Sequence, residues 1–227
     1  MDKVFSVAAV WPDALDGGGE LFVDLPATPC ELRDVREKLR LGAGEAALFR
    51  VDEFYRFDFL APHLSETYDL VKLNALAEKL SELEPEQVTV LAGLVQMDEV
   101  KQASPIGLPR LIDLAYSTER CHIVGEVLND AQLGRFCAEN GFLPELDGLP
   151  DEVFDLLDFE RIGREHRQRE GGVLVDRTAD HPGGYVERHS DLVQAYKEIN
   201  ELSAPVIKCK KTPRKKCNYV AERREKR

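Results

Sequence analysis

Residues 70–83, LVKLNALAEKLSEL, decide the middle of the fold. The apolar side chains in this stretch recur at i, i+3, i+4 and i+7, at Leu70, Leu73, Leu76, Ala77, Leu80 and Leu83. The charged side chains fall on the other face: Lys72, Glu78, Lys79 and Glu82. A period of 3.6 residues predicts an amphipathic helix whose apolar stripe faces a core.

Two prolines further along the chain predict two more helices, because proline is well suited to the first helical position. Pro85 begins a helix that extends to about Met97, and Pro109 begins one that extends to about Tyr116. Three short helices with brief connections are typical of a bundle. We assign this helical bundle domain to residues 63–125.

Before the bundle, the pattern over the first sixty residues is β-β-α-β. Apolar runs at 3–10, 20–25 and 46–54 predict strands, and the first two are separated by a turn that contains three glycines at 17–19. Thr28, Pro29 and Glu31 form a capping box for a helix that Gly42 ends. We assign residues 1–62 to a small N-terminal α+β domain.

After the bundle, residues 121–124 predict a short strand, and Asn129 or Asp130 begins a helix that ends near Gly141. A hairpin over 173–188 and a helix over 190–201 follow. We assign residues 126–205 to a C-terminal acidic α+β domain. The expected fold is therefore an elongated α+β protein.

Charge is divided between two opposed parts of the chain. Lys and Arg number 30 and Asp and Glu 42, and residues 208–227 hold ten of the bases and two of the acids. The remaining 207 residues carry 20 basic and 40 acidic side chains, a net charge of −20. Duplex DNA carries one charge per about 1.7 Å of axis, so this excess matches roughly ten base pairs. The acidic body could present itself as DNA.

The basic segment 206–227 is predicted to be a disordered tail, because it is highly charged and poor in apolar residues. Three roles are open for it: contacts to nucleic-acid phosphates, docking onto the acidic body, or a solvated extension.

The densest acidic stretch is 145–160, ELDGLPDEVFDLLDFE. A helix over 151–157 would align Asp151, Asp155 and Asp158 on one face and turn Val153, Phe154, Leu156 and Leu157 inward. We predict a DNA-mimic surface from this stretch and from acids on two predicted helices or their borders. Its members are Glu145, Asp147, Asp151, Glu152, Asp155, Asp158, Glu160, Glu78, Glu82, Glu126 and Asp130. A solvated acidic face without a partner is the alternative.

Patterns typical of catalysis or metal binding are sparse. Cys121 and His122 are neighbours on a predicted strand, where adjacent side chains point to opposite faces. There is no C-x-x-C or H-E-x-x-H motif, and the glycines at 17–19 lack the spacing of a phosphate-binding loop. Cys209 and Cys217 with His189 could form a zinc site, but we expect a free tail. We predict no enzyme activity, no cofactor and no metal.

The expected cellular setting follows from three features of the sequence. Apolar runs are far shorter than the ~20 residues that span a bilayer, and Asp2 stands where a signal peptide would be basic. The five cysteines, Cys30, Cys121, Cys137, Cys209 and Cys217, are widely spaced and odd in number, which favours reduced thiols. We expect a cytoplasmic protein without membrane contact.

Several segments, in order, resemble the ArdA antirestriction family of conjugative plasmids and transposons. They are Gly19–Pro26 (GELFVDLP), Leu73–Ala77 (LNALA), Asn129–Phe136 (NDAQLGRF) with Glu139-Asn140-Gly141, and Leu157–Arg164 (LDFERIGR) before a Gly-Gly-Tyr-Val hairpin. The likeness covers most of residues 3–190. The family's Tyr-Asn-x-Gly turn after the first strand is absent and the basic tail has no counterpart, so the chain resembles a divergent member.

The resemblance implies an elongated homodimer that imitates bent B-DNA and occupies the DNA channel of type I restriction-modification enzymes, without catalysis. The expected partner is the methyltransferase core of such an enzyme, and the acidic body itself would not bind DNA. We place the dimer contact in residues 150–188, which hold apolar side chains in excess: Phe154, Leu157, Phe159, Ile162, Val173 and Tyr185. The alternative is an acidic scaffold or regulatory protein of a mobile element, with the tail touching nucleic acid.

Overall fold

A computed structural model describes residues 2–10, 21–40, 48–101, 105–146, 148, 150–154 and 156–202. Several predicted features lie outside these residues: the glycine turn at 17–19, Asp147, Asp155 and the whole basic tail. Within the described residues, helices combine with two small sheets, which confirms the α+β class.

The first sheet is antiparallel, with strand order β2-β1-β3-β4. Its strands are β1 (Phe5–Ala9), β2 (Phe22–Leu25), β3 (Leu48–Phe54) and β4 (Thr67–Asp69). Three of them match the predicted strands. β4 was not predicted, because its three residues are too few to show a period of two and they directly precede Asp69, the N-cap of the next helix.

Helix α1 (Pro29–Lys38) begins at the predicted capping box. The Thr28 hydroxyl accepts a hydrogen bond from the Glu31 amide, and the Glu31 carboxylate accepts one from the Thr28 amide at 2.6 Å. The helix ends at Lys38, earlier than the predicted stop at Gly42.

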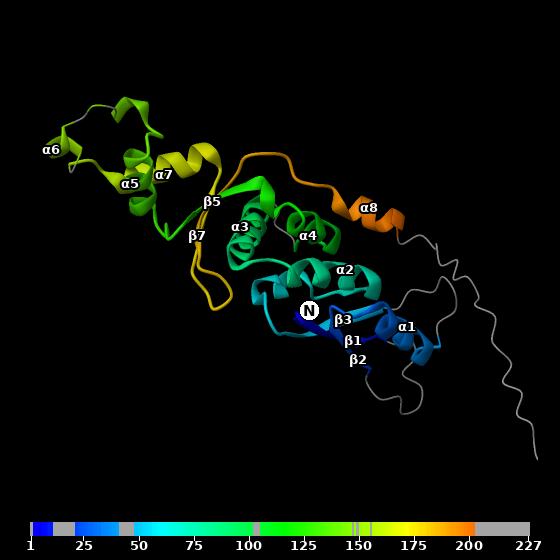
Figure 1. Cartoon of the computed structure of the whole chain (residues 1–227). Helices are drawn as coiled ribbons and strands as arrows, with labels where there is room; N and C mark the ends of the chain where they lie inside the picture. Colours follow the sequence, from blue (N-terminus) through cyan, green and yellow to red (C-terminus); the bar gives the residue numbers. More distant parts are fainter. Residues whose placement is uncertain are drawn as a thin grey trace, which may run out of the picture.

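Three helices form the centre of the molecule, on one side of the first sheet (Figure 1). They are α2 (Leu70–Ser81), α3 (Pro85–Lys101) and α4 (Leu108–Ala115), as predicted from the apolar period and the two prolines. α2 packs on the first sheet, α4 packs on α2, and α3 packs against the second sheet. A single apolar cluster runs from β1 through these helices to Val186 of the second sheet. This core contains residues from both sides of residue 62, where the sequence places a domain boundary. The domain boundaries assigned from the sequence stay predictions.

The second sheet has strand order β5-β7-β6 and is built from β5 (Cys121–Gly125), β6 (Val173–Val175) and β7 (Gly184–Arg188). It contains the predicted strand and hairpin, joined by antiparallel pairing of β5 with β7. Its inner face packs on α3, where an added Cβ at Gly93 would lie 2.9 Å from Val186. Helix α8 (Ala195–Leu202) begins five residues later than predicted.

Residues 126–172 form a distal lobe at the far end of the elongated body (Figure 1). It contains the predicted helix α5 (Asp130–Glu139), a 3-10 turn at Pro144–Leu146, the short α6 (Asp151–Phe154) and α7 (Phe159–Glu170). Helix α7 was not predicted. Asp158 caps it by accepting from the Arg161 amide, and Gly171 ends it at φ 68°. No helix among the described residues is long and apolar enough to cross a bilayer.

Candidate functional site

The first group of acids lies where α2 ends and α3 begins. This α2–α3 acidic corner consists of Glu78, Glu82, Glu84 and Glu86. Glu82, Glu84 and Glu86 are exposed, and none of the three forms an ion pair within the described residues. Glu78 is half-buried and accepts from Asn74 Nδ2 at 2.9 Å.

The negative charge of this corner affects the pKa of Tyr116. Burial raises the pKa of its phenol, and Glu82 and then Glu78 raise it further. The one cation shown beside the ring is Lys79, whose Nζ lies 5.3 Å from the ring centre. The corner therefore presents more negative charge than its described surroundings neutralise.

A second group of acids lies on the outer face of the first sheet. Asp24 of β2 and Glu53 of β3 both pair with Ser6 of β1, so they lie in one row across three strands. Both are exposed, and the Tyr55 hydroxyl donates to Asp24 Oδ1 at 2.9 Å. That bond is the main reason why the pKa of Tyr55 is raised.

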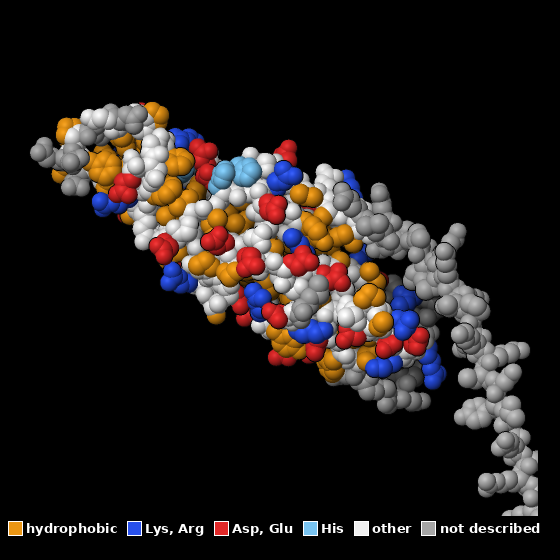
Figure 2. Space-filling view, viewed as in Figure 1, with side chains coloured by type: hydrophobic (Ala, Val, Ile, Leu, Met, Phe, Trp, Pro, Cys, Tyr) orange, Lys and Arg blue, Asp and Glu red, His pale blue; other side chains and the backbone are white. Residues whose placement is uncertain are grey.

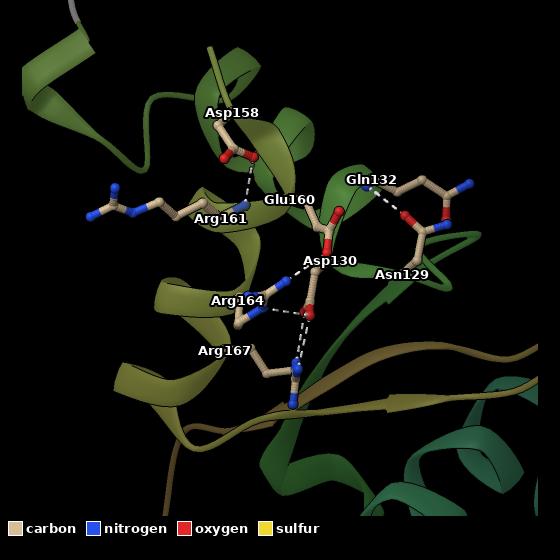
Figure 3. Close-up of polar contacts among 8 residues, drawn as sticks. All are labelled: Asn129, Asp130, Gln132, Asp158, Glu160, Arg161, Arg164 and Arg167. Atoms are coloured by element: carbon tan, nitrogen blue, oxygen red, sulfur yellow. Dashed lines mark hydrogen bonds and ion pairs between the residues drawn. The ribbon is translucent and has the colours of Figure 1, made fainter.

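Asp130, an acid of the predicted surface, is mostly enclosed and is paired (Figure 3). Its two oxygens accept from Arg167 Nε at 2.8 Å and Nη2 at 2.9 Å, and Arg164 Nε lies 3.9 Å away. The side chain is 15% exposed. Hydrogen bonds from Arg167 lower the pKa of Asp130, although burial opposes the shift. Asp130 therefore holds α5 to α7.

The exposed acids of the distal helices are paired with arginines in the same way. Glu139 pairs with Arg135 at 2.8 Å, and Glu165 pairs with Arg161 at 2.9 Å. Glu160, a predicted surface acid, contacts Arg164 at 2.5 Å. The exposed glutamates Glu139, Glu160 and Glu165 of α5 and α7 are therefore each balanced by an arginine.

The predicted helix over 151–157 is wrong beyond Phe154, where α6 ends. Leu156 and Leu157 form a turn and bend, because the chain has to reverse before Asp158 caps α7. Asp158 therefore does not continue the face of Asp151, and Asp155 lies outside the described residues. The inward placement is also wrong for Val153 and Leu156, which are 41% and 84% exposed.

The remaining predicted acids lie at separate places. Glu126 is exposed directly after β5, at φ 64°. Glu145 is exposed in the 3-10 turn, and Asp151 and Glu152 form the first turn of α6. The structure does not bring these acids together with Glu78 and Glu82. Sequence analysis missed Glu84 and Glu86, although their position around Pro85 was a usable signal.

A cavity of about 160 Å³ lies between the 3-10 turn and α7. Its polar lining is formed by Glu145, Glu165, His166 and Arg169. His166 Nδ1 accepts from Arg169 at 3.2 Å, which assigns the ring proton to Nε2, 3.7 Å from Glu187.

The thiols near the second sheet are poor nucleophiles. Burial is the main cause that raises the pKa of Cys121 and of Cys137 to about 11, so both are protonated at neutral pH. Within the described ranges, no group of three His, Cys, Asp or Glu side chains is placed to hold a metal ion.

No protein-family model matches this chain, and a search of the curated proteins finds no match.

Proposed function

We propose that this protein is an antirestriction protein that acts as a DNA mimic in the cytoplasm. It occupies the DNA channel of a type I restriction-modification enzyme, as a homodimer and without catalysing a reaction. The proposed organisation is three consecutive parts along one elongated axis: the N-terminal sheet, the central helices and the distal lobe.

The observation that carries this proposal is the contrast between two sets of exposed acids. On the N-terminal and central parts, Glu53, Glu82, Glu84 and Glu86 have no basic partner within the described residues. On α5 and α7, by contrast, the exposed Glu139, Glu160 and Glu165 pair with arginines. Carboxylates without internal partners are available to bind lysines and arginines of another protein. The mimic surface that we propose therefore includes these acids of the N-terminal and central parts and leaves out the arginine-paired acids of α5 and α7.

The mechanism is competitive occupancy. Exposed carboxylates take the positions of DNA phosphates opposite the basic side chains of the enzyme. Each contact releases bound counterions, so the affinity should fall steeply with salt concentration. A dimer of bodies that each match roughly ten base pairs would extend to roughly twenty.

The proposal is tested by displacement of a labelled DNA duplex from a purified type I methyltransferase at several salt concentrations. One variant changes Glu82, Glu84 and Glu86 to Gln. We expect it to displace DNA about tenfold less well, since three exposed charge contacts contribute about 0.2–1 kcal/mol each. Its salt dependence should flatten by up to about three ion equivalents.

The matched control changes Glu139, Glu160 and Glu165 to Gln. It removes the same formal charge, but from acids that already pair with arginines. We expect a smaller loss of displacement than for the corner variant. Equal losses would mean that only net charge matters. No displacement by the unmodified protein would overturn the proposal.

The alternative function is an acidic scaffold or regulatory protein of a mobile element, and one observation favours it. The distal lobe exposes large apolar side chains: Phe142 at 50%, Val153 at 41% and Leu156 at 84%. Such side chains favour a contact with another protein. They also suit the proposed dimer contact better than Tyr185, which is 1% exposed.

Sedimentation of the Leu156→Glu variant separates the two functions. The mimic proposal expects a dimer for the unmodified chain at micromolar concentration and a monomer for the variant. DNA displacement should then weaken, because the mimic is shortened by half. A monomer for both proteins, without DNA displacement, would favour the scaffold.

A further inference from the structure

We infer that His122 and His189 form a binding site for a divalent transition-metal cation. The chain has five histidines, and all of them lie in the described residues. Three are buried: His63 at 4%, His166 at 7% and His181 at 5% exposure. His122 and His189 are the two exposed ones. This inference does not depend on the proposed function.

The pairing of two strands brings these imidazoles together. His122 of β5 lies opposite Glu187 of β7, and the His189 amide donates to the Arg120 carbonyl at 3.1 Å, which continues the same ladder. Side chains two residues apart on a strand share a face, so His189 and His122 lie diagonally on one face. Histidine side chains lie side by side on the surface between the distal lobe and the central helices (Figure 2).

The distance between the two rings suits one shared ion. The ring centres are 4.4 Å apart, with 36° between the ring planes. A metal–nitrogen bond of about 2.0–2.1 Å places an ion about 3.2 Å from each ring centre, so two imidazoles at angles between square and tetrahedral have centres about 4.5–5.2 Å apart. Both rings are exposed, so side-chain rotation can direct one nitrogen of each at a common ion.

The imidazole ligands determine which class of metal ion can bind. It is a good ligand for Ni²⁺, Cu²⁺ and Zn²⁺, whereas Mg²⁺ and Ca²⁺ prefer oxygen. Among the described residues, no third His, Cys, Asp or Glu completes the set. Water fills the remaining positions of an ion bound here, so we expect an exchangeable ion held by two side chains.

A bound ion would connect β5 to β7 on the surface. Strand β5 leads into the distal lobe, so the connection would strengthen the sheet from which that lobe extends. An ion that binds only the folded state raises the free energy of unfolding by RT ln(1 + [metal]/Kd). The melting temperature should therefore rise with metal concentration.

The experiment is Ni²⁺ titration of the untagged full chain by calorimetry and by thermal unfolding, with Mg²⁺ as the comparison ion. We expect Ni²⁺ binding and no Mg²⁺ binding at the same concentration. His122→Gln and His189→Gln should each lower Ni²⁺ affinity at least tenfold. The affinity of the unmodified chain should also fall on acidification, because protons compete with the metal ion for the imidazole nitrogens.

Two further variants keep the test specific. Arg188→Gln changes an exposed neighbour on β7 and should leave Ni²⁺ affinity unchanged. A Cys209→Ser, Cys217→Ser double variant removes the two thiols of the tail and should also bind Ni²⁺ unchanged. Loss of binding in the cysteine variant, or unchanged affinity in both histidine variants, would overturn the inference.

Discussion

Asp130 shows how a single acid can be used inside the protein rather than on its surface. The sequence places it among the mimic acids, but its carboxylate accepts two hydrogen bonds from Arg167 and is mostly enclosed. An acid with a bidentate arginine has little capacity left for a partner protein. Negative charge counted from composition is therefore larger than the negative charge that is available for recognition.

Asp130→Asn should lower the free energy of unfolding by about 1.5–3 kcal/mol at pH 7, because it removes hydrogen bonds between charged groups. The folded pKa of Asp130 lies below its ordinary value of 3.8. Its contribution is therefore complete above that value and is lost as the pH falls through the folded pKa. Urea unfolding at pH 7 and near pH 3 measures this. Glu139→Gln, in an exposed pair, should cost less than about 1 kcal/mol, and an Asp130 effect that does not shrink in acid would contradict the assignment.

We expect a second pH dependence of stability from His181. This residue lies at the contact between the β6–β7 turn and the N-terminal part. Its ring packs edge-to-face on Phe59, and Asp180 beside it accepts from the Phe57 amide at 3.1 Å. Burial lowers the pKa of His181 below 6.5, although Asp180 opposes the shift. The unfolded chain therefore takes up a proton first as the pH falls, and stability decreases below about pH 6.5.

The measurement is the free energy of unfolding from pH 7.5 to 5 for the unmodified chain and for His181→Leu. We expect a decrease of up to about 1.4 kcal/mol per pH unit in the unmodified chain and a flatter profile in the variant. His122→Gln, at an exposed histidine, should keep the unmodified slope. Parallel profiles for all three proteins would exclude His181 as the source.

At the scale of elements, the crossing of α5 and α7 depends on two glycines. An added Cβ at Gly134 would lie 1.9 Å from the Phe159 carbonyl oxygen, and one at Gly163 would lie 1.9 Å from that of Asp130. The two backbones therefore touch at the crossing. Contact this close also brings Arg167 of α7 within reach of Asp130 on α5.

Gly134→Ala and Gly163→Ala should each lower the melting temperature, although alanine is favoured over glycine in a helix by about 1 kcal/mol. The steric cost at the crossing exceeds that gain, because backbone atoms have to move apart. Thermal unfolding followed by circular dichroism measures the change. Gly125→Ala is the control, since an added Cβ there meets nothing within 4 Å. A higher melting temperature for Gly163→Ala would show that the backbones of α5 and α7 are not in contact.

Local signals predicted most elements of this fold. Thr28 and Glu31 mark the start of α1, Asn129 marks that of α5, and Pro85 marks that of α3. Helix α7 escaped prediction because it is rich in arginine and has Gly163 in its interior, which argues against a helix unless the partner helix is known. The arginine partners of Asp130 and Glu160 were not predicted for the same reason, because these arginines lie on α7.

At the scale of the whole molecule, shape and charge have to be considered together. The body is elongated (Figure 1), and Glu53, Glu82, Glu84 and Glu86 on its N-terminal and central parts are exposed without an ion pair among the described residues. Composition predicted the excess of charge but not its distribution, because arginines pair with Asp130, Glu139, Glu160 and Glu165 on α5 and α7. The negative charge that is available to a partner is therefore smaller than the charge counted from the sequence.

Deletion of residues 208–227 should leave displacement of DNA from a type I methyltransferase intact or improve it. The segment carries a net charge of +8, which opposes imitation of a polyanion, and without it the net charge changes from −12 to −20. Displacement at several salt concentrations measures this, with a steeper salt dependence expected for the shortened chain. Abolished displacement would instead assign the activity to the tail.

The connections of the distal lobe have a consequence for how such a protein can evolve. The chain leaves the second sheet after Gly125 and returns at Val173, and the two strands concerned are separated by β7 alone. Two strand spacings are about 10 Å, which four or five extended residues can span. The lobe is thus an insertion between fixed, nearby points. Related chains could exchange it for a lobe of different length or partner preference while keeping the rest of the architecture.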